Sequence, residues 1–558
     1  MSNPPVNAFF KSASEPLIDY SALRALVVDD YPGMRNALRL TLSNLGVTKV
    51  QVASNAAEAL FQIRNRDHDF ILCDFNLGDG RDGQQLLEEL RHGNLIPLET
   101  VFMMVTSESY YEKVVATAEL APDDYMIKPF SAEVLCSRLE AILLRKQAFR
   151  EVYRHFAVRD LEAAIVACDA LLRDRPRYVV DALRFKGELL VTLGRFDEAE
   201  ALYQQVIAMR AIPWARLGLA RALHMQQKDD AAETELHDVL THAPEMVAAY
   251  DLLSDVCLAK KNAAGAQAAL QRGVAISSRT VRRQQKLGET AYANGDLDTA
   301  REAYAAAIDK GRHSIFLTPN DYGNLCRVQA EQGDYKAVAD TLKKNKAELQ
   351  SSPEGRLVLA VTKSVLHVRA GRQDDAAKSL DEAGELRATG TRGDARLMLD
   401  LAGACMSSGR DDEADGIVAE VARNAHDSDS LLAKARKLYE DAGRVSTGAA
   451  MLASATADVR RLNNEGVVLA QRGDFRSAAE KLLTACESAP YNPRIAMNAV
   501  WVILKHIDKS GMDEPMIEAA RRALDAAERQ APGHPRLAGL RLDMKDMESR
   551  FGIQRKAG

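Results

Sequence analysis

Residues 23–30 read LRALVVDD, an apolar run that ends in two adjacent aspartates. A short apolar run bounded by polar residues is typical of a strand buried inside a parallel sheet. Helical spacing follows directly, because Met34, Leu38, Leu42 and Leu45 fall on one face of a helix. A buried strand followed by an amphipathic helix is the first unit of an α/β fold.

The same alternation continues to about residue 145. Further strands are expected at 49–53, 70–73, 101–105 and 125–127, and helices at 58–64, 84–91, 111–119 and from Ser131 onward. Strands that alternate with helices form a parallel sheet with helices on both faces. The sequence therefore predicts a doubly wound, five-stranded α/β domain over residues 21–145, preceded by a tail at 1–20.

Polar side chains collect where the predicted strands end. Asp29 and Asp30 follow the first strand, Asp74 the third, Thr106 the fourth and Lys128 the fifth. Ligand sites of open parallel sheets lie outside the carboxyl ends of the strands. These five residues are thus expected to converge on one site.

From about residue 150 the pattern becomes wholly helical, with small residues at recurring offsets. The set Gly187, Gly194, Ala199 and Tyr203 recurs as Gly288, Gly295, Ala300 and Tyr304, and again as Gly466, Gly473, Ala478 and Leu482. The second position of the set can be followed along the chain through Arg159, Gly194, Gln227, Lys261, Gly295, Gly333, Gly371, Gly409, Gly443 and Gly473. Successive steps span 33–38 residues, except the last, which spans 30.

This period and these offsets resemble the tetratricopeptide repeat, a helix–turn–helix unit that stacks into a solenoid. Small residues let two antiparallel helices approach closely, and the glycine at the second position suits a turn with positive φ. We expect an all-α helical-hairpin solenoid over residues 146–495 and capping helices over 496–558. The helix from Glu133 to Phe156 contains neither glycine nor proline, so we expect it to run unbroken from one domain into the next.

Composition narrows the class of protein. The chain has 558 residues, of which 47% are hydrophobic, and its formal net charge is -6. This negative charge argues weakly against binding to DNA or another nucleic acid, because proteins that bind nucleic acid usually carry an excess of basic residues. Its seven scattered cysteines suggest a reducing compartment rather than disulfides. No apolar stretch approaches the roughly 18 residues that span a bilayer, and residues 1–14 lack a signal-like segment. A cytoplasmic protein without a membrane anchor is expected.

Four motifs of the first domain, which together carry the five polar residues above, resemble the response-regulator receiver family of bacterial two-component signalling. They are the acid pair of LVVDD, Asp74 after DFILC, Thr106 in MMVTS, and Lys128 with Pro129 in DDYMIKPF. The resemblance implies that Asp74 accepts a phosphoryl group. It also implies a Mg²⁺ ion held by Asp30 and Asp74, by Asp29 through a bound water, and by the backbone carbonyl of Asn76.

The resemblance assigns the remaining residues as well. Lys128 would pair with one phosphoryl oxygen and the hydroxyl of Thr106 would donate to another. Tyr125 matches the aromatic residue that moves with this switch. Pro129, after a cis peptide bond, would support the loop of Lys128. One departure stands out: Leu77-Gly78 replaces the family's usual Met-Pro pair in a loop one residue longer, which puts phosphoryl lifetime and kinase docking in question.

The sequence thus favours a regulator that is phosphorylated by a histidine kinase or phosphotransfer protein and that binds an unidentified protein partner in the groove of its repeats. It predicts no enzyme activity beyond this self-phosphorylation, and no catalytic motif is present in residues 150–558. The alternatives are a constitutive scaffold, with the receiver as a docking or dimerisation module, and an RNA-binding regulator. The sign of control and a homodimer through the receiver are left open.

Overall fold

The computed structural model describes residues 18–78, 80–106, 122–531 and 535–552. The chain forms two compact units, the first comprising residues 1–191 and 195–317 and the second residues 192–194 and 318–558. Within the described residues, no helix is long and apolar enough to cross a membrane.

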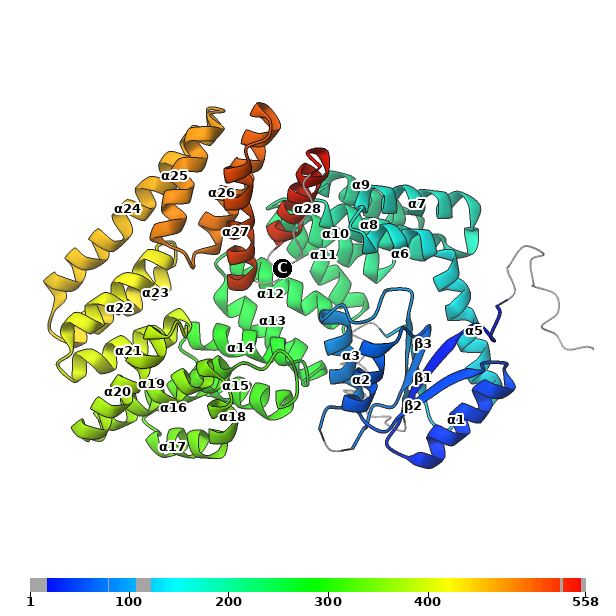
Figure 1. Cartoon of the computed structure of the whole chain (residues 1–558), viewed down its shortest axis with the longest axis horizontal. Helices are drawn as coiled ribbons and strands as arrows, with labels where there is room; N and C mark the ends of the chain where they lie inside the picture. The colour runs from blue at the N-terminus through cyan, green and yellow to red at the C-terminus, as the bar shows by residue number, and fades with distance from the viewer. Residues whose placement is uncertain (1–17, 79, 107–121, 532–534, 553–558) are drawn as a thin grey trace, which may run out of the picture. The chain divides into compact units, whose positions relative to one another are not determined.

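A five-stranded parallel sheet opens the first unit (Figure 1). Its strands are β1 (Arg24–Val28), β2 (Lys49–Ala53), β3 (Phe70–Cys73), β4 (Val101–Thr106) and β5 (Asp124–Ile127), in the order β2-β1-β3-β4-β5. The chain turns outward to β2 on one side of β1 and returns to β3 on the other. This reversal of strand order is the position at which such sheets form their ligand sites.

Helices cover both faces of the sheet, as the alternating pattern predicts. Side chains of α1 (Pro32–Asn44) and α5 (Ala132–Ala148) pack with Ala25 and Val27 of β1 on one face. Side chains of α2 (Ala56–Asn65) and α3 (Gly83–His92) pack with Leu26 and Val28 on the other. The α/β prediction is therefore confirmed; the helix expected at 111–119 lies outside the described residues.

The helix that leaves the sheet is not continuous, contrary to expectation. It is divided at Phe149 into α5 and α6 (Arg150–Ala157). Phe149 has φ -85° and ψ 1°, and only 2% of its surface is exposed. Its ring stacks on Tyr153 with centroids 5.7 Å apart and meets Phe185 edge-on at 6.4 Å. The absence of glycine and proline excludes a flexible linker, but aromatic packing still bends the chain at this joint.

Helices fill the rest of the chain. The first unit continues with α7 (Leu161–Asp174), α8 (Val179–Thr192), α9 (Phe196–Met209), α10 (Pro213–Met225), α11 (Asp229–His242), α12 (Val247–Ala259), α13 (Ala263–Ile276), α14 (Val281–Ala293) and α15 (Leu297–Gly311). The second contains α16 (Pro319–Glu331), α17 (Tyr335–Lys344), α18 (Lys346–Gln350), α19 (Pro353–Arg369), α20 (Gln373–Ala388), α21 (Ala395–Ser407), α22 (Asp411–Asn424), α23 (Asp429–Asp441), α24 (Val445–Gln471), α25 (Phe475–Ser488), α26 (Pro493–Ser510), α27 (Glu514–Gln530) and α28 (Pro535–Arg550).

The turns of these helical hairpins fall where the sequence period places them. All ten positions that mark the period have positive φ. Seven are glycines with φ between 68° and 79°; the other three are Arg159, Gln227 and Lys261, at 60–63°. Glycine adopts this left-handed conformation without steric cost, whereas other residues rarely do so. The recurring glycine therefore marks the turn that closes each hairpin.

The small residue of each set makes room for the bulky one 16 positions later. A Cβ on Gly187 would lie 2.5 Å from the ring of Tyr203, and one on Gly288 would lie 2.9 Å from Tyr304. In the second unit a Cβ on Gly466 would lie 2.6 Å from Leu482. The recurring offset in the sequence is thus a packing rule. Glycine on one helix leaves room for the bulky side chain of the neighbouring helix.

One long helix departs from the regular repeat. Two separate helices are expected between the turns at Gly443 and Gly473, yet α24 spans 27 residues without interruption. Those two turns are only 30 residues apart, the shortest step of the series. The segment also lacks a proline like Pro176, Pro244 or Pro490, which follows the second helix of other repeats. A proline in this segment would have ended or kinked the helix.

The packing rule can be tested with two helical glycines of the second unit. Gly466→Ala should lower the free energy of unfolding of this unit by about 1–3 kcal/mol, because the methyl group overlaps buried Leu482. Gly416→Ala in α22 is the matched control, since a Cβ there meets nothing within 4 Å. It should stabilise by about 0.5–1 kcal/mol. Urea unfolding followed by circular dichroism measures both, and equal effects would contradict the rule.

In the first unit, α3 packs against two loops from much later in the chain. The side chain of Ser314 donates a hydrogen bond to Glu88 at 2.9 Å, and the two residues are only 9% and 5% exposed. Burial raises the pKa of Glu88 to about 6, although the hydrogen bond from Ser314 and the charge of Arg279 lower it, while Asp82 adds to the rise. A carboxylate is thus held in the interior at neutral pH.

Glu88→Gln should therefore stabilise the first unit near pH 7. The folded-state pKa lies above the ordinary 4.5, so stability is lost as the pH rises from about 4.5 to about 6. At 1.36 kcal/mol per pKa unit the gain at pH 7 is up to about 2 kcal/mol, and it should disappear below pH 4.5. Urea unfolding at both pH values measures it, with exposed Glu245→Gln as control. A gain that is independent of pH would refute this cause.

Candidate functional site

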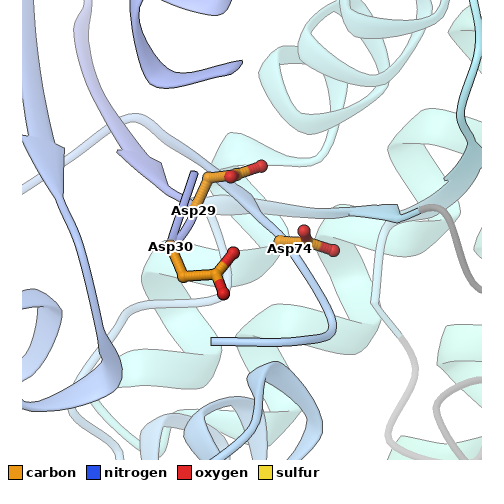
Figure 2. A group of neighbouring side chains, drawn as sticks. All are labelled: Asp29, Asp30 and Asp74. Carbon is orange, nitrogen blue, oxygen red and sulfur yellow. The ribbon is translucent and has the colours of Figure 1, made fainter. Parts of the chain in front are cut away.

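Three aspartates meet at the carboxyl ends of β1 and β3 (Figure 2). Asp29 and Asp30 follow β1, Asp74 follows β3, and the two strands are neighbours, with Val28 paired to Cys73. One carboxylate oxygen from each aspartate lies within 4.8 Å of the others. The sheet register, rather than sequence proximity, creates this cluster.

Backbone hydrogen bonds fix two of the three aspartates. The Asp74 N–H donates to the carbonyl of Val28 at 2.8 Å, which ties the end of β3 to β1. The carboxylate of Asp29 accepts a hydrogen bond of 2.9 Å from the N–H of Tyr31. Its carbonyl accepts another, of 2.6 Å, from Arg35. Asp29 and Asp74 are buried, whereas Asp30 is exposed.

Lys128 places its charge between the two buried carboxylates. Its Nζ lies 2.8 Å from Oδ2 of Asp29 and 2.9 Å from Oδ2 of Asp74. Burial opposes this charge, but the hydrogen bonds to Asp29 and Asp74 outweigh it and raise the pKa of Lys128. The residue directly follows β5, and its peptide bond to Pro129 is cis, as the resemblance implied.

Asp74 is the least satisfied member of the site. Burial raises its pKa, although the hydrogen bond from Lys128 lowers it. Its Oδ1 is buried and has no hydrogen-bond partner among the described residues. A buried polar atom without a partner is uncommon and calls for an explanation, such as a ligand. Asp74 therefore presents one oxygen to whatever binds at this site.

The cluster suits a small divalent cation. Three carboxylates against one ammonium leave two net negative charges, and two carboxylates 4 Å apart repel by about 4 kcal/mol at an effective dielectric of 20. Mg²⁺ prefers such oxygen ligands and keeps several of its waters. Exposed Asp30 leaves space for those waters. The residues present thus fit Mg²⁺.

The other predicted residues lie on β4, on β5 and in the loop after β3. Thr106 is the last residue of β4 and pairs with Ile127 of β5. Tyr125, half-buried, packs against the core beneath α2 and α3 and lies opposite Met104 in the sheet. Asn76 is exposed in the loop that follows β3. Direct contacts thus join Lys128 to Asp29 and Asp74, with Asp30 near them and Tyr125 in the core of the sheet.

The local structure of the loop after β3 explains why leucine and glycine stand at positions 77 and 78. Leu77 is 2% exposed and belongs to the core beneath α2 and α3, so it serves as an apolar anchor. Gly78 has φ 75°, a conformation that proline cannot adopt. At the end of the loop, a Cβ on Gly83 would lie 2.1 Å from the carbonyl oxygen of Asp74. Sequence reasoning missed this requirement at Gly83, for which the glycine itself was the only signal.

Comparison with known proteins identifies both parts of the chain. Residues 25–140 match the response regulator receiver domain, and residues 149–213 and 186–238 match the tetratricopeptide repeat. Over 123 residues the chain is 31% identical to Chemotaxis protein CheY-3 of Vibrio cholerae, covering 22% of this chain and 93% of that protein. The chain belongs to the response-regulator receiver family.

Other members of this family show the same coverage. Chemotaxis protein CheY of Pseudomonas aeruginosa is also 31% identical over 123 residues, which are 22% of this response regulator and 98% of that protein. A solved receiver domain protein of Methanospirillum hungatei is 28% identical over 22% of this chain and 96% of its own, with a TM-score of 0.20. Receiver domains are phosphoacceptor signalling modules, and here one is joined to tetratricopeptide repeats.

The acidic cluster predicts a stabilising response to Mg²⁺. Saturating Mg²⁺ should raise the free energy of unfolding of the first unit, by about 2.7 kcal/mol at 100 times its Kd. Asp30→Asn should remove most of this gain, because one of the three clustered carboxylates loses its charge. Thermal unfolding with and without Mg²⁺ measures the effect. The control Asp67→Asn, at an exposed site, should respond like the wild type. Equal responses of both variants would contradict a metal site here.

Proposed function

We propose that this response regulator accepts a phosphoryl group on Asp74 and passes the resulting change to its repeat helices, which bind a partner protein. The observation that carries this proposal is the buried, unpartnered Oδ1 of Asp74 beside the ammonium of Lys128. A buried carboxylate oxygen that no described side chain or backbone group satisfies is available as a nucleophile. The nearby positive charge would then stabilise the anionic product.

The proposed transfer uses a histidine kinase or phosphotransfer protein as donor. The Asp74 oxygen attacks phosphorus, the bond from phosphorus to the donor's imidazole nitrogen breaks, and that nitrogen keeps the electron pair and takes a proton. Asp30, Asp74 and the Asn76 carbonyl, with Asp29 through a water, would hold a Mg²⁺ ion, which would supply positive charge to offset that of the phosphoryl oxygens. Lys128 exchanges its contact with Asp74 for one with a phosphoryl oxygen.

The same proposal assigns switch roles to Thr106 and Tyr125 and gives the bounds of the domains. Thr106 would donate to the phosphoryl group, and Tyr125 would move in the core as β4 shifts. The change would reach the repeats through α5 and the joint at Phe149. We take residues 21–145 as the receiver, 146–495 as the solenoid and 496–558 as its cap, in a cytoplasmic protein. The partner protein is recognised by the concave surface that such solenoids form.

Phosphoryl transfer is tested by incubation with acetyl phosphate and Mg²⁺, a donor that needs no kinase. Intact-mass spectrometry should detect one added phosphoryl group on the wild type and on Asp67→Asn, and none on Asp74→Asn. Omission of Mg²⁺ should slow the reaction strongly, because the clustered carboxylates repel the donor. Labelling that persists in Asp74→Asn would refute the assignment of the phosphoacceptor.

Regulated partner binding needs a separate test. Full-length protein with Mg²⁺ and beryllofluoride, which mimics the phosphoryl group, is compared with the untreated protein as bait for binding proteins. A partner whose recovery changes for the wild type but not for Asp74→Ala supports the regulated adaptor. Equal recovery in both states contradicts it and favours the constitutive scaffold. Binding that falls steeply with salt would instead indicate RNA.

A further inference from the structure

The hairpin that α23 forms with the first half of α24 departs from the packing of the other repeats. In every repeat, the position seven residues before the turn lies on the first helix of the hairpin. At the tenth of these positions stands Arg436, which is exposed and forms no ion pair or side-chain hydrogen bond with the described residues. The other nine are buried and uncharged: Val152, Gly187, Ala220, Ser254, Gly288, Cys326, Ser364, Ala402 and Gly466.

The small and bulky residues of this hairpin have also changed places. Gly448 of α24 stands five residues after the turn, where the three sets in the sequence have alanine. A Cβ on Gly448 would lie 2.3 Å from the side chain of Tyr439 in α23. Here the second helix supplies the small residue and the first helix supplies the bulky one. Arg436 is therefore not part of the packing between the two helices, and its charge lies at the surface.

The hairpin also lacks the helix that covers a regular repeat. In a regular repeat the chain reverses after the second helix and the next helix returns alongside it. A Cβ on Gly218 of α10, for example, would lie 2.4 Å from the ring of Tyr203 in α9. In contrast, α24 continues as one helix (Figure 1), and its second half pairs with α25 through Gly466 and Leu482. Because a helix cannot fold back on itself, this second half cannot return to lie beside α23.

A cleft of about 340 Å³ lies at this uncovered place, and the described residues that line it all belong to α23 and α24. Its buried lining residues include Tyr439 and Leu452. Val445, which is 58% exposed, and exposed Ala449 and Ala453 follow one another at four-residue intervals along α24. Residues four apart lie on one face of a helix, and small side chains let another helix approach closely. The cleft therefore suits one more helix.

The charged side chains of the cleft favour an acidic occupant. Arg436 and Arg460 line it from α23 and α24, against a single acid, Glu440. The guanidinium of Arg460 donates hydrogen bonds of 2.7 and 3.2 Å to the carbonyl of His426, which fix its position. Because a carbonyl is neutral, these bonds leave the charge of Arg460 uncompensated. Complementary charge across an interface speeds association and selects the partner.

We propose that the cleft between α23 and α24 binds an amphipathic helix of a partner protein. The apolar side chains of this helix pack against Val445, Ala449 and Ala453. Its acidic side chains pair with Arg436 and Arg460. The partner helix thus occupies the place that the first helix of the next repeat has in a regular hairpin. This site lies within the second unit, is additional to the concave surface proposed above, and does not depend on phosphorylation of the receiver.

Two synthetic peptides test the proposal, with fluorescence anisotropy measuring their binding to full-length protein. Each is a stapled helix of about four turns, with leucines at i, i+3, i+4 and i+7. One carries glutamates beside the leucines, and the other carries lysines at the same positions. The wild type should bind the glutamate peptide about fivefold more tightly, and Arg436→Glu should reverse this preference. Exposed Arg356→Glu in α19 is the matched control and should bind like the wild type.

A second variant tests the place of binding without a change of charge. Ala449→Trp fills the cleft from an exposed position and should abolish binding of both peptides, while circular dichroism shows an unchanged helix content. The inference is overturned if the wild type binds neither peptide, binds both equally, or binds as Ala449→Trp does. A wild-type dimer in sedimentation velocity that Ala449→Trp makes monomeric would assign the cleft to a second copy of this chain and overturn it too. Labelling by acetyl phosphate tests the proposed function separately.

Discussion

The position of Lys128 between Asp29 and Asp74 is the interaction on which the site depends. The register of β1 and β3 brings three carboxylates together, and two of them are buried. Such a group of like charges is stable only with cations inside it. Lys128 supplies one positive charge at 2.8 and 2.9 Å, which leaves part of the negative charge uncompensated. The remaining charge is what suits the site to a divalent cation.

The packing of the repeats depends on a second constraint: a small residue on one helix must face a bulky residue on the neighbouring helix. Each small residue stands opposite a bulky one, as Gly187 does to Tyr203 and Gly466 to Leu482. Because the pair is separated by a fixed number of residues, each hairpin specifies its own packing. Repeats that contact mainly their neighbours can be added one after another. The same rule therefore holds in both units, whatever the surface residues are.

Local rules explain which features the sequence could predict. Patterns within a few dozen residues predicted the bounds of β2 and β3, the helices on both faces of the sheet and all ten turns. The break at Phe149 depends on aromatic rings contributed by α6 and α8. The unbroken length of α24 goes with the absence of a proline from that segment. The pair of Arg279 and Asp82 joins residues 197 positions apart, and neither belongs to a motif. No periodicity could reveal it.

The receiver is therefore joined to the repeats of its unit at two places of unequal strength. At Phe149 the side chain is almost fully buried, and truncation of such a residue typically costs about 3–5 kcal/mol. At Arg279 the ion pair is partly exposed and contributes about 0–1 kcal/mol, with a similar amount from the hydrogen bond of Ser314 to Glu88. The second contact therefore costs much less free energy to separate than the first. The joint at Phe149 is thus the firm connection between α5 and the repeats, and the contact at Arg279 is the weaker one.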